Sequence, residues 1–185
     1  NKYMLEDFDY VFSEYTSELL DEILHMIEND EGEGRFLLLL DDIIDSSAMR
    51  RGATAKIDGL ISRYRHIGNG EVEGKLTIAM ATQYFKSISV IARNNATAYY
   101  IMGMLPEMEL GKISESLSYF GGSSKAFLDI FYRSKKEAYD FLYLSVEHLE
   151  ARRNHTDLLW KQGDNMYKSA EQLKAETEIK DNIMK

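Results

Sequence analysis

The sequence predicts an all-α fold, a single-domain helical bundle over residues 1–185. Three observations lead to this prediction. The chain has one proline and twelve glycines, too few for the frequent turns of an all-β protein. Apolar residues recur every three or four positions over long stretches, as they do on one face of a helix. Hydrophobic residues make up 44% and charged residues 29%, a balance typical of a globular protein with a sizeable core.

The expected helices are separated by short breaks that are polar or contain glycine. They cover residues 3–29, 35–50, 60–67, 76–104, 106–120, 124–152 and 157–182. Pro106 fits the first turn of its helix, where proline is tolerated and the acids Glu107 and Glu109 suit the helix dipole. Ser123 or Ser124 is suited to cap the helix that follows.

Composition argues against several classes of function. The net charge of −9 disfavours a nucleic-acid partner, and the absence of cysteine excludes disulfides and thiolate chemistry. No apolar run approaches the length of a membrane span. The start at Asn1 shows no secretory pattern and lacks an initiator methionine, so we expect a trimmed chain and a cytoplasmic location. The four histidines share no metal-ligand spacing.

A run of aspartates follows the apolar stretch 36–40. On the expected helix, Asp41 and Asp45 lie one turn apart on one face, with Asp42 beside them. Such carboxylates repel one another unless cations neutralise them, and Mg²⁺ takes carboxylate and phosphate oxygens. Arg50 and Arg51 follow at a spacing that lets their guanidinium groups reach a phosphate. A solvated acidic surface and a simple ion pair within the helix remain the alternatives.

The pattern Asp41-Asp42-x-x-Asp45-x-Ser47-x-x-Arg50-Arg51-Gly52 resembles the first aspartate-rich motif of the trans-isoprenyl (polyprenyl) diphosphate synthases. The resemblance implies an all-α bundle of the isoprenoid synthase type, apparently shortened. It implies a transferase that uses Mg²⁺ to condense isopentenyl diphosphate with an allylic diphosphate into a longer trans-prenyl diphosphate. Family members are commonly dimers, so a homodimer is expected. The residues implied are Asp41, Asp42 and Asp45 as catalytic metal ligands, and Arg35, Arg50, Arg51 and Thr97 as substrate-binding residues.

Other family features are altered in this chain. Glu33 stands where a lysine is usual before Gly34-Arg35, and Ala96 replaces the lysine that normally precedes Thr97. Of the second aspartate motif, Asp129 alone remains. Either the chain is a degenerate, shortened relative, or the sequence omits loops around the active site. The alternative function is a non-catalytic helical bundle, as an inactive prenyl synthase subunit or as a PhoU-like domain that regulates phosphate through a metal site.

Overall fold

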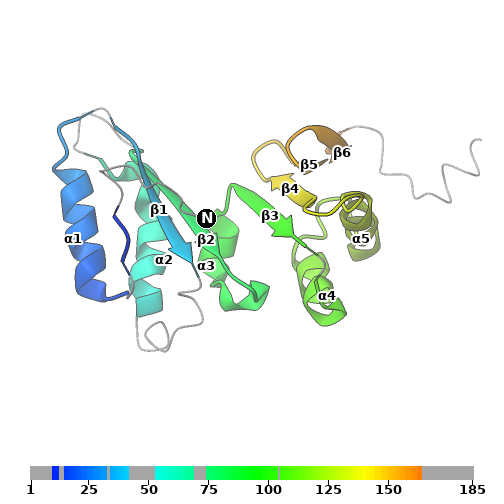
Figure 1. Ribbon diagram of the computed structural model, residues 1–185, viewed down its shortest axis with the longest axis horizontal. Coiled ribbons are helices and arrows are strands. Elements are labelled where there is room, and N and C mark those ends of the chain that lie inside the picture. The colour runs from blue at the N-terminus through cyan, green and yellow to red at the C-terminus, as the bar shows by residue number, and fades with distance from the viewer. Residues whose placement is uncertain are drawn as a thin grey trace, which may run out of the picture. The chain divides into compact units, whose positions relative to one another are not determined.

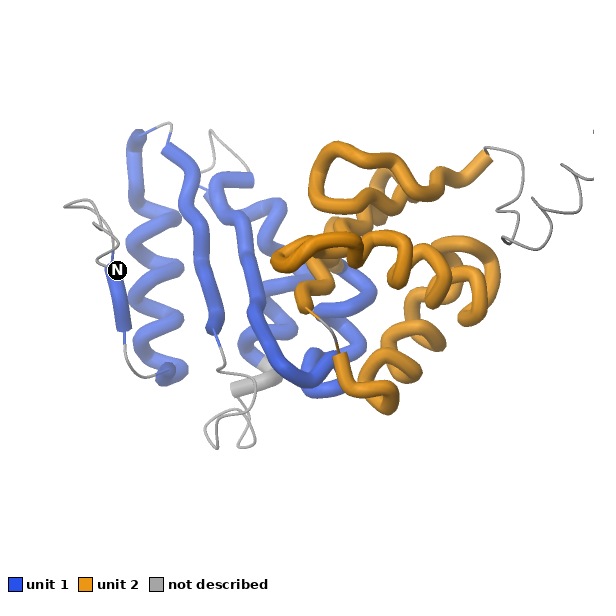
Figure 2. The backbone as a smooth tube through the Cα atoms, turned by 45° about the vertical axis from the view of Figure 1, so that its right-hand side comes forward, with its two compact units in different colours: residues 1–95 blue, residues 96–185 orange. Residues whose placement is uncertain are grey.

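The computed structural model describes residues 10–12, 15–32, 34–41, 53–68, 74–103 and 105–163, with the backbone alone for residues 53–55. These residues form five α-helices and six β-strands in two sheets, so the prediction of an all-α bundle is wrong. The chain divides into two compact units, residues 1–95 (unit 1) and 96–185 (unit 2), shown in blue and orange in Figure 2. The expectation of a single domain over residues 1–185 stays a prediction.

Unit 1 is built around a β–α–β arrangement (Figure 1). Strands β1 (Phe36–Asp41) and β2 (Leu76–Ala81) pair in parallel, and the chain passes between them through helix α2 (Ala53–Arg63) and the 3-10 turn η3 (Tyr64–His66). Helix α1 (Ser17–Glu28) precedes β1, whereas η4 (Phe85–Ser87) and helix α3 (Val90–Asn95) follow β2. The register aligns the two strands from their first residues to their last.

The core of unit 1 lies between the two strands and the helices. Buried side chains of α1, at spacings of four and three, pack with those of α2 and with one buried leucine from each strand. They are Leu20, Leu24, Ile27, Ile57, Leu60, Ile61, Leu40 and Leu76. Two other leucines of β1 remain 65% (Leu37) and 61% (Leu39) exposed. This is unusual, because parallel sheets are normally covered on both faces.

Unit 2 combines two helices with an antiparallel sheet. Its sheet has the order β3 (Ala98–Met102), β4 (Phe141–Ser145), β5 (Glu150–Arg153) and β6 (Asp157–Lys161). Helices α4 (Glu107–Ser116) and α5 (Ser124–Arg133) lie between β3 and β4 in the sequence. Alternate sheet residues join the helices in the core, which includes Ile101, Leu110, Ile113, Phe120, Phe127, Ile130, Phe131, Leu142, Leu144 and Ala151.

Several segments that were expected to be helical contain strands instead. The helix expected over residues 35–50 is wrong where it can be tested, because residues 36–41 form β1. The long helix over residues 76–104 is replaced by β2, η4, α3 and β3. Of residues 124–152, only the first ten are helical, and the remainder contains β4 and most of β5. In the segment 157–182, residues 157–161 form β6, and residues 164–182 lie outside the described part.

Other expected helices are confirmed in part, although α1 begins at residue 17, with residues 10–12, 15 and 16 not helical, and α2 begins at residue 53 rather than 60. Residues 17–28 of the first expected helix and residues 60–66 of the third are helical. Pro106 occupies the cap position directly before α4, one residue earlier than expected. Ser123 caps α5, since its side chain accepts a hydrogen bond from the backbone N–H of Ala126 at 3.1 Å. Among the described residues, none of the helices is long and apolar enough to cross a membrane.

Candidate functional site at the carboxyl end of the parallel strands

The carboxyl ends of β1 and β2 lie side by side and carry polar residues. Asp41 ends β1, is exposed, and pairs in register with Ala81, the last residue of β2. Thr82 and Gln83 follow immediately. In open sheets with parallel strands, ligands bind at the carboxyl edge, where the loops that leave the strands diverge. This edge is therefore the candidate site of unit 1.

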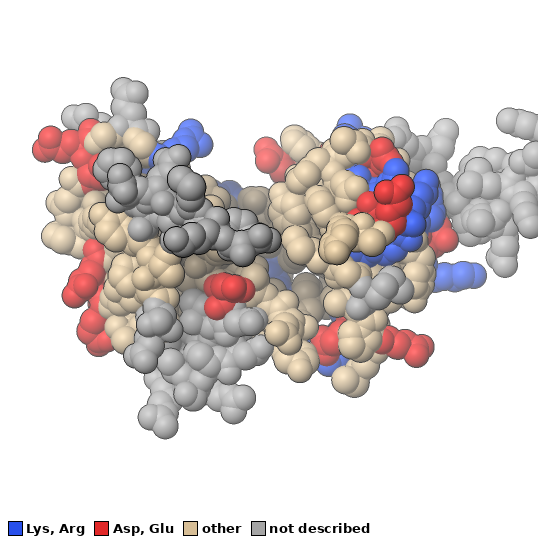
Figure 3. Space-filling model, in the orientation of Figure 1, with Lys and Arg blue, Asp and Glu red and all other residues tan. Residues whose placement is uncertain are grey.

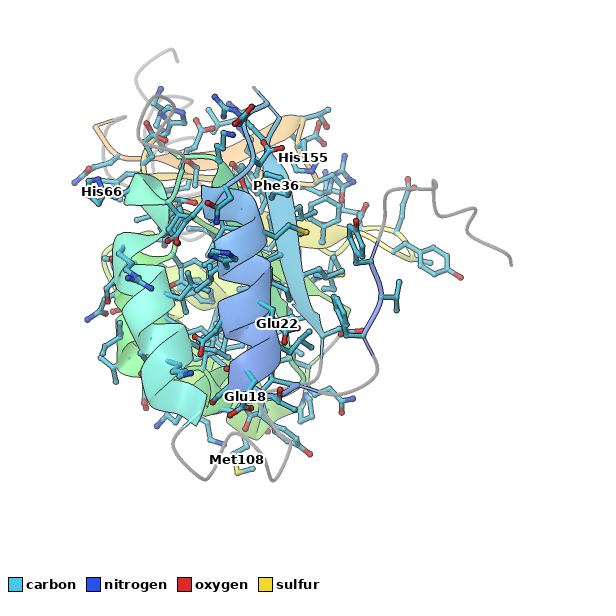
Figure 4. The ribbon with its side chains drawn as sticks, turned by 90° about the vertical axis from the view of Figure 1, so that its left-hand side faces the viewer. Glu18, Glu22, Phe36, His66, Met108 and His155 are labelled. Carbon is cyan, nitrogen blue, oxygen red and sulfur yellow. The ribbon has the colours of Figure 1, made fainter. Side chains whose placement is uncertain are left out.

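Helices α1 and α2 begin at the same edge. Lys56, in the first turns of α2, donates hydrogen bonds to the carboxylate of Asp21 at 2.7 Å and to the carbonyl of Ser17 at 3.4 Å, so the two helix starts are adjacent. Figure 4 shows Glu18 at the end of α1 opposite to Phe36, where β1 begins. A helix carries partial positive charge at its N-terminus, which Glu18 in the first turn of α1 offsets.

The turn after β2 is fixed by side-chain hydrogen bonds. The hydroxyl of Thr82 accepts from the backbone N–H of Tyr84 at 3.2 Å and lies 2.9 Å from the hydroxyl of Ser87. The hydroxyl of Ser87 in turn donates to the carbonyl of Tyr84 at 2.5 Å. Gln83 is exposed in the middle of this turn. Its backbone position is thus set by its neighbours, and its side chain is open to solvent.

A second contact anchors the start of α3. The hydroxyl of Ser89 donates to the carboxylate of Asp58 in α2 at 2.5 Å and accepts from the backbone N–H of Ala92 at 3.0 Å. This serine therefore caps α3 and ties it to the neighbouring helix. The start of α3 is in this way joined to the middle of α2.

The electrostatics of this edge depend on a small group of charges. The hydrogen bond from Lys56 to Asp21 raises the pKa of that lysine, so its charge persists at neutral pH. Burial raises the pKa of the Tyr15 phenol, which lies near Lys56 and Asp21. The Tyr15 hydroxyl is buried and finds no hydrogen-bond partner in the described residues. It remains a protonated donor at neutral pH.

At the opposite, amino-terminal edge of the sheet, a buried lysine holds the loop before β1 through hydrogen bonds. Lys75, fully buried, precedes β2 and donates to the Asp30 carbonyl at 2.7 Å, the Asp30 carboxylate at 2.9 Å and the Gly32 carbonyl at 2.5 Å. The hydrogen bond from Lys75 holds the pKa of the Asp30 carboxyl below its ordinary value. The backbone N–H of Phe36 donates to the carbonyl of Lys75 at 2.7 Å. This contact fixes the loop that leads from α1 into β1.

The residues predicted from the sequence fall at different places. Asp41 lies at the end of a strand, so its expected position on a helix is wrong. Arg35 precedes the same strand, about 20 Å away along β1 at roughly 3.3 Å per residue. The structure therefore does not bring these two residues together. Thr97 belongs to unit 2, where its carbonyl accepts from the backbone N–H of Val146 at 2.9 Å.

The remaining predicted residues, Asp42, Asp45, Arg50 and Arg51, lie outside the described residues. Within the described ranges, no group of three or more His, Asp or Glu side chains could hold a metal ion. Sequence reasoning missed Thr82 and Gln83. The signal that could have found them is the repetition of an apolar run followed by polar residues, once at 36–42 and again at 76–83.

No protein-family model matches the chain, and comparison with curated proteins and with solved structures also finds no match.

Proposed function

We propose that unit 1 forms part of a magnesium-dependent site for a nucleoside triphosphate, with phosphoryl transfer to water as its reaction. The observation that supports this most is the position of Asp41, at the carboxyl end of an apolar strand that is paired in parallel with its neighbour. In nucleotide hydrolases with phosphate-binding loops, an aspartate in this kind of position helps to hold the Mg²⁺ that bridges the β- and γ-phosphates.

The residues of the edge have separate tasks in this proposal. Asp41 would supply carboxylate oxygens to the shell of Mg²⁺, and Asp42, the other expected ligand at this edge, lies outside the described residues. Mg²⁺, if held there, would supply neutralisation of the charge that develops on the phosphate oxygens. Gln83, in the turn after β2, orients the attacking water through its amide, a task that glutamine performs in other nucleotide hydrolases. The start of α2 adds positive potential.

The complete site needs a phosphate-binding loop, and the described residues of unit 1 contain none that is rich in glycine. They also leave Leu37 and Leu39 exposed on one face of the parallel sheet. A cover over this face would bury the two leucines. In the proposal, the described unit contributes the metal-binding half of the site.

Prenyl transfer remains an alternative, which rests on the likeness of the segment from Asp41 to Gly52 to a prenyl synthase motif. Both reactions need Mg²⁺ and a diphosphate group. The all-α bundle that the likeness implied is absent from the described residues, so nucleotide chemistry at the strand ends has the stronger support.

Binding of a fluorescent ATP analogue to the whole chain, with and without Mg²⁺, tests the proposal. We expect affinity that depends on Mg²⁺ and falls at least about tenfold in Asp41→Asn, because one ligand charge is lost. Glu31→Gln is the matched control, since it removes one exposed charge at the amino-terminal edge. Equal losses in both variants would refute the assignment of Asp41.

A parallel incubation with isopentenyl diphosphate, an allylic diphosphate and Mg²⁺ separates the two reactions. Formation of a longer prenyl diphosphate without any nucleotide binding would favour the alternative. If neither class of ligand binds, the chain fits the non-catalytic alternative.

A further inference from the structure

The turn after β2 contains a closed ring of hydrogen bonds formed by Thr82, Tyr84 and Ser87, which we call the hydroxyl ring. The backbone N–H of Tyr84 donates to the Thr82 hydroxyl at 3.2 Å, and the two hydroxyls lie 2.9 Å apart. The Ser87 hydroxyl lies 2.5 Å from the Tyr84 carbonyl, whereas the Thr82 hydroxyl lies 3.3 Å from it. Because Ser87 donates its one proton to this carbonyl, the proton between the two hydroxyls belongs to Thr82. Each hydroxyl therefore donates one hydrogen bond and accepts one.

The hydroxyl ring fixes the backbone on both sides of Gln83. Thr82 precedes Gln83 and Tyr84 follows it, so both neighbours have polar atoms in the ring. The backbone N–H of Ser87 also donates to the Tyr84 carbonyl, at 3.0 Å, and closes η4 on the same residue. The Gln83 side chain is exposed and has no hydrogen-bond partner among the described residues. Its amide is therefore available for a ligand, although the backbone that carries it is held.

The turn is also anchored at its two ends. Before the ring, Ala81 pairs in register with Asp41, so Thr82 directly follows the residue beside the proposed metal ligand. After Gln83, the side chain of Phe85 is 9% exposed, and the guanidinium group of Arg93 lies 5.3 Å from its ring centroid. The hydroxyl ring thus connects Gln83 to the sheet on one side and to a buried aromatic side chain on the other.

The hydroxyl ring can influence a reaction by position, because it adds no charge. Thr82, Gln83 and Ser87 are all uncharged. Figure 3 shows mostly acidic side chains on the face of unit 1 in its view, so the affinity for a polyphosphate depends on the metal ion rather than on this turn. The orientation of an attacking water is much more sensitive to position, since a misplacement of about 1 Å can lower a rate about 100-fold.

We propose that Thr82 and Ser87 are positioning residues for Gln83, because their hydroxyls hold its amide where it orients the water for hydrolysis of the nucleoside triphosphate. In this step the water oxygen bonds to the γ-phosphorus, the bond to the bridging β–γ oxygen breaks, and the proton of the water passes to a phosphate oxygen. Neither hydroxyl touches the nucleotide. The inference rests on the proposed function of unit 1 and adds the residues that set the geometry of its reaction.

Phosphate release by the whole chain at varied concentrations of Mg²⁺-ATP tests the proposal. Thr82→Val removes the hydroxyl but keeps the shape, and should lower kcat about 10- to 100-fold while KM changes less than about twofold. Thr82→Ser keeps the hydroxyl and should restore most of kcat. Thr77→Val is the matched control, because Thr77 is an exposed threonine of β2 outside the ring, and its kcat should equal that of the unchanged protein. In a Gln83→Ala background, Thr82→Val should cause no further loss, because the amide that it positions is gone.

Measurements without nucleotide test the hydroxyl ring itself. Thr82→Val should accelerate hydrogen exchange of the Tyr84 amide and lower the NMR order parameter of the Gln83 amide from about 0.85 to below about 0.6, whereas Thr77→Val should change neither. If Thr82→Val does not fold, Ser87→Ala removes the other hydroxyl and should lower kcat with the same small change in KM.

The outcomes separate this proposal from the proposed function. The positioning role alone is overturned if the unchanged chain hydrolyses ATP and a folded Thr82→Val keeps its kcat, loses as much kcat without Gln83 as with it, or keeps the order parameter of the Gln83 amide. Absence of Mg²⁺-dependent ATP binding, or of phosphate release, in the unchanged chain would overturn the proposed function and this inference with it.

Discussion

Replacement of Lys75 by methionine tests how the sheet of unit 1 is held together. The Lys75 ammonium group is fully buried and makes three hydrogen bonds, two of them to the carbonyls of Asp30 and Gly32. Methionine keeps the length of the apolar stem but leaves both carbonyls without this donor. Removing one partner of a buried charged network costs about 3–5 kcal/mol. Because part of Asp30 is open to water, we expect a loss near the lower limit, about 3 kcal/mol in the free energy of unfolding.

Urea denaturation followed by far-ultraviolet circular dichroism measures this loss, and a decrease of about 6–12 °C in Tm should accompany it. Hydrogen exchange should become faster for the backbone amides of β2, which starts beside Lys75. Asp30→Asn is the control variant, since it removes one charge but leaves both carbonyl bonds to the ammonium group, and it should cost less. A change below about 1 kcal/mol for Lys75→Met would refute the role given to this contact.

Two further predictions concern unit 2. Gly121→Ala should destabilise the protein by about 2 kcal/mol or more, because φ is +103° there and the new Cβ would lie 3.0 Å from the Cβ of Ala126. Gly122→Ala, at a φ of +85° with open space around it, should lower the free energy of unfolding by less than Gly121→Ala does. Urea titrations of the two variants measure both losses, and equal losses would contradict the role given to the Ala126 contact. Hydrogen bonds, first from the Asn154 side chain and then from the Glu137 backbone, hold the pKa of Asp140 below its ordinary value of 3.8. Its stabilisation is therefore complete above about pH 4 and is lost as the pH falls through the lowered pKa. Asn154→Ala should raise the Asp140 pKa in an NMR titration, and an unchanged pKa would contradict the assigned cause.

The helices could be predicted in part from sequence, because their signals are local. Thr16 caps α1 through a hydrogen bond from the backbone N–H of Leu19, and Ser123 caps α5 in the same way. Buried apolar residues of α1 also follow the helical spacing. Such caps and spacings identify a helix without knowledge of its neighbours in space.

The strands could not be predicted in the same way. A short apolar run such as residues 36–40 has the same composition in a buried helix and in a parallel strand, and only pairing with residues 76–80 decides between them. The sequence of β5, Glu150–Arg153, contains residues that favour helices, and the neighbouring strands override that preference.

The scarcity of glycine and proline was misleading for a separate reason. Tyr139, Leu149 and Asn154 adopt positive φ angles of 72°, 46° and 54°, conformations that are usual for glycine. All three lie in turns beside the strands of unit 2. Tyr139 and Leu149 give no turn signal in the sequence, whereas Asn154 is a usual turn residue, so the count of glycines and prolines underestimated the number of turns.

The metal chemistry expected from the sequence around Asp41 stays a prediction, whereas the expected helical framework is wrong. The sequence indicated carboxylates and Mg²⁺ around Asp41, which the proposed nucleotide site retains. The framework differs, because Asp41 lies beside Ala81 at the end of a parallel pair of strands. The spacing of Asp41 and Asp45 was interpreted as one helical turn, an assumption that fails when the first of the two is in a strand.

The most direct test of the proposed site is to locate the bound metal ion. Mn²⁺, which accepts the same oxygen ligands as Mg²⁺, broadens NMR signals of nearby nuclei when added with ATP. The account predicts selective broadening of the backbone amide signals of Asp41, Ala81 and Gln83, and sharp signals at Phe36 and Lys75 at the opposite edge. Broadening centred on the amino-terminal edge, or no broadening in unit 1, would contradict a metal-nucleotide site at the carboxyl ends of β1 and β2.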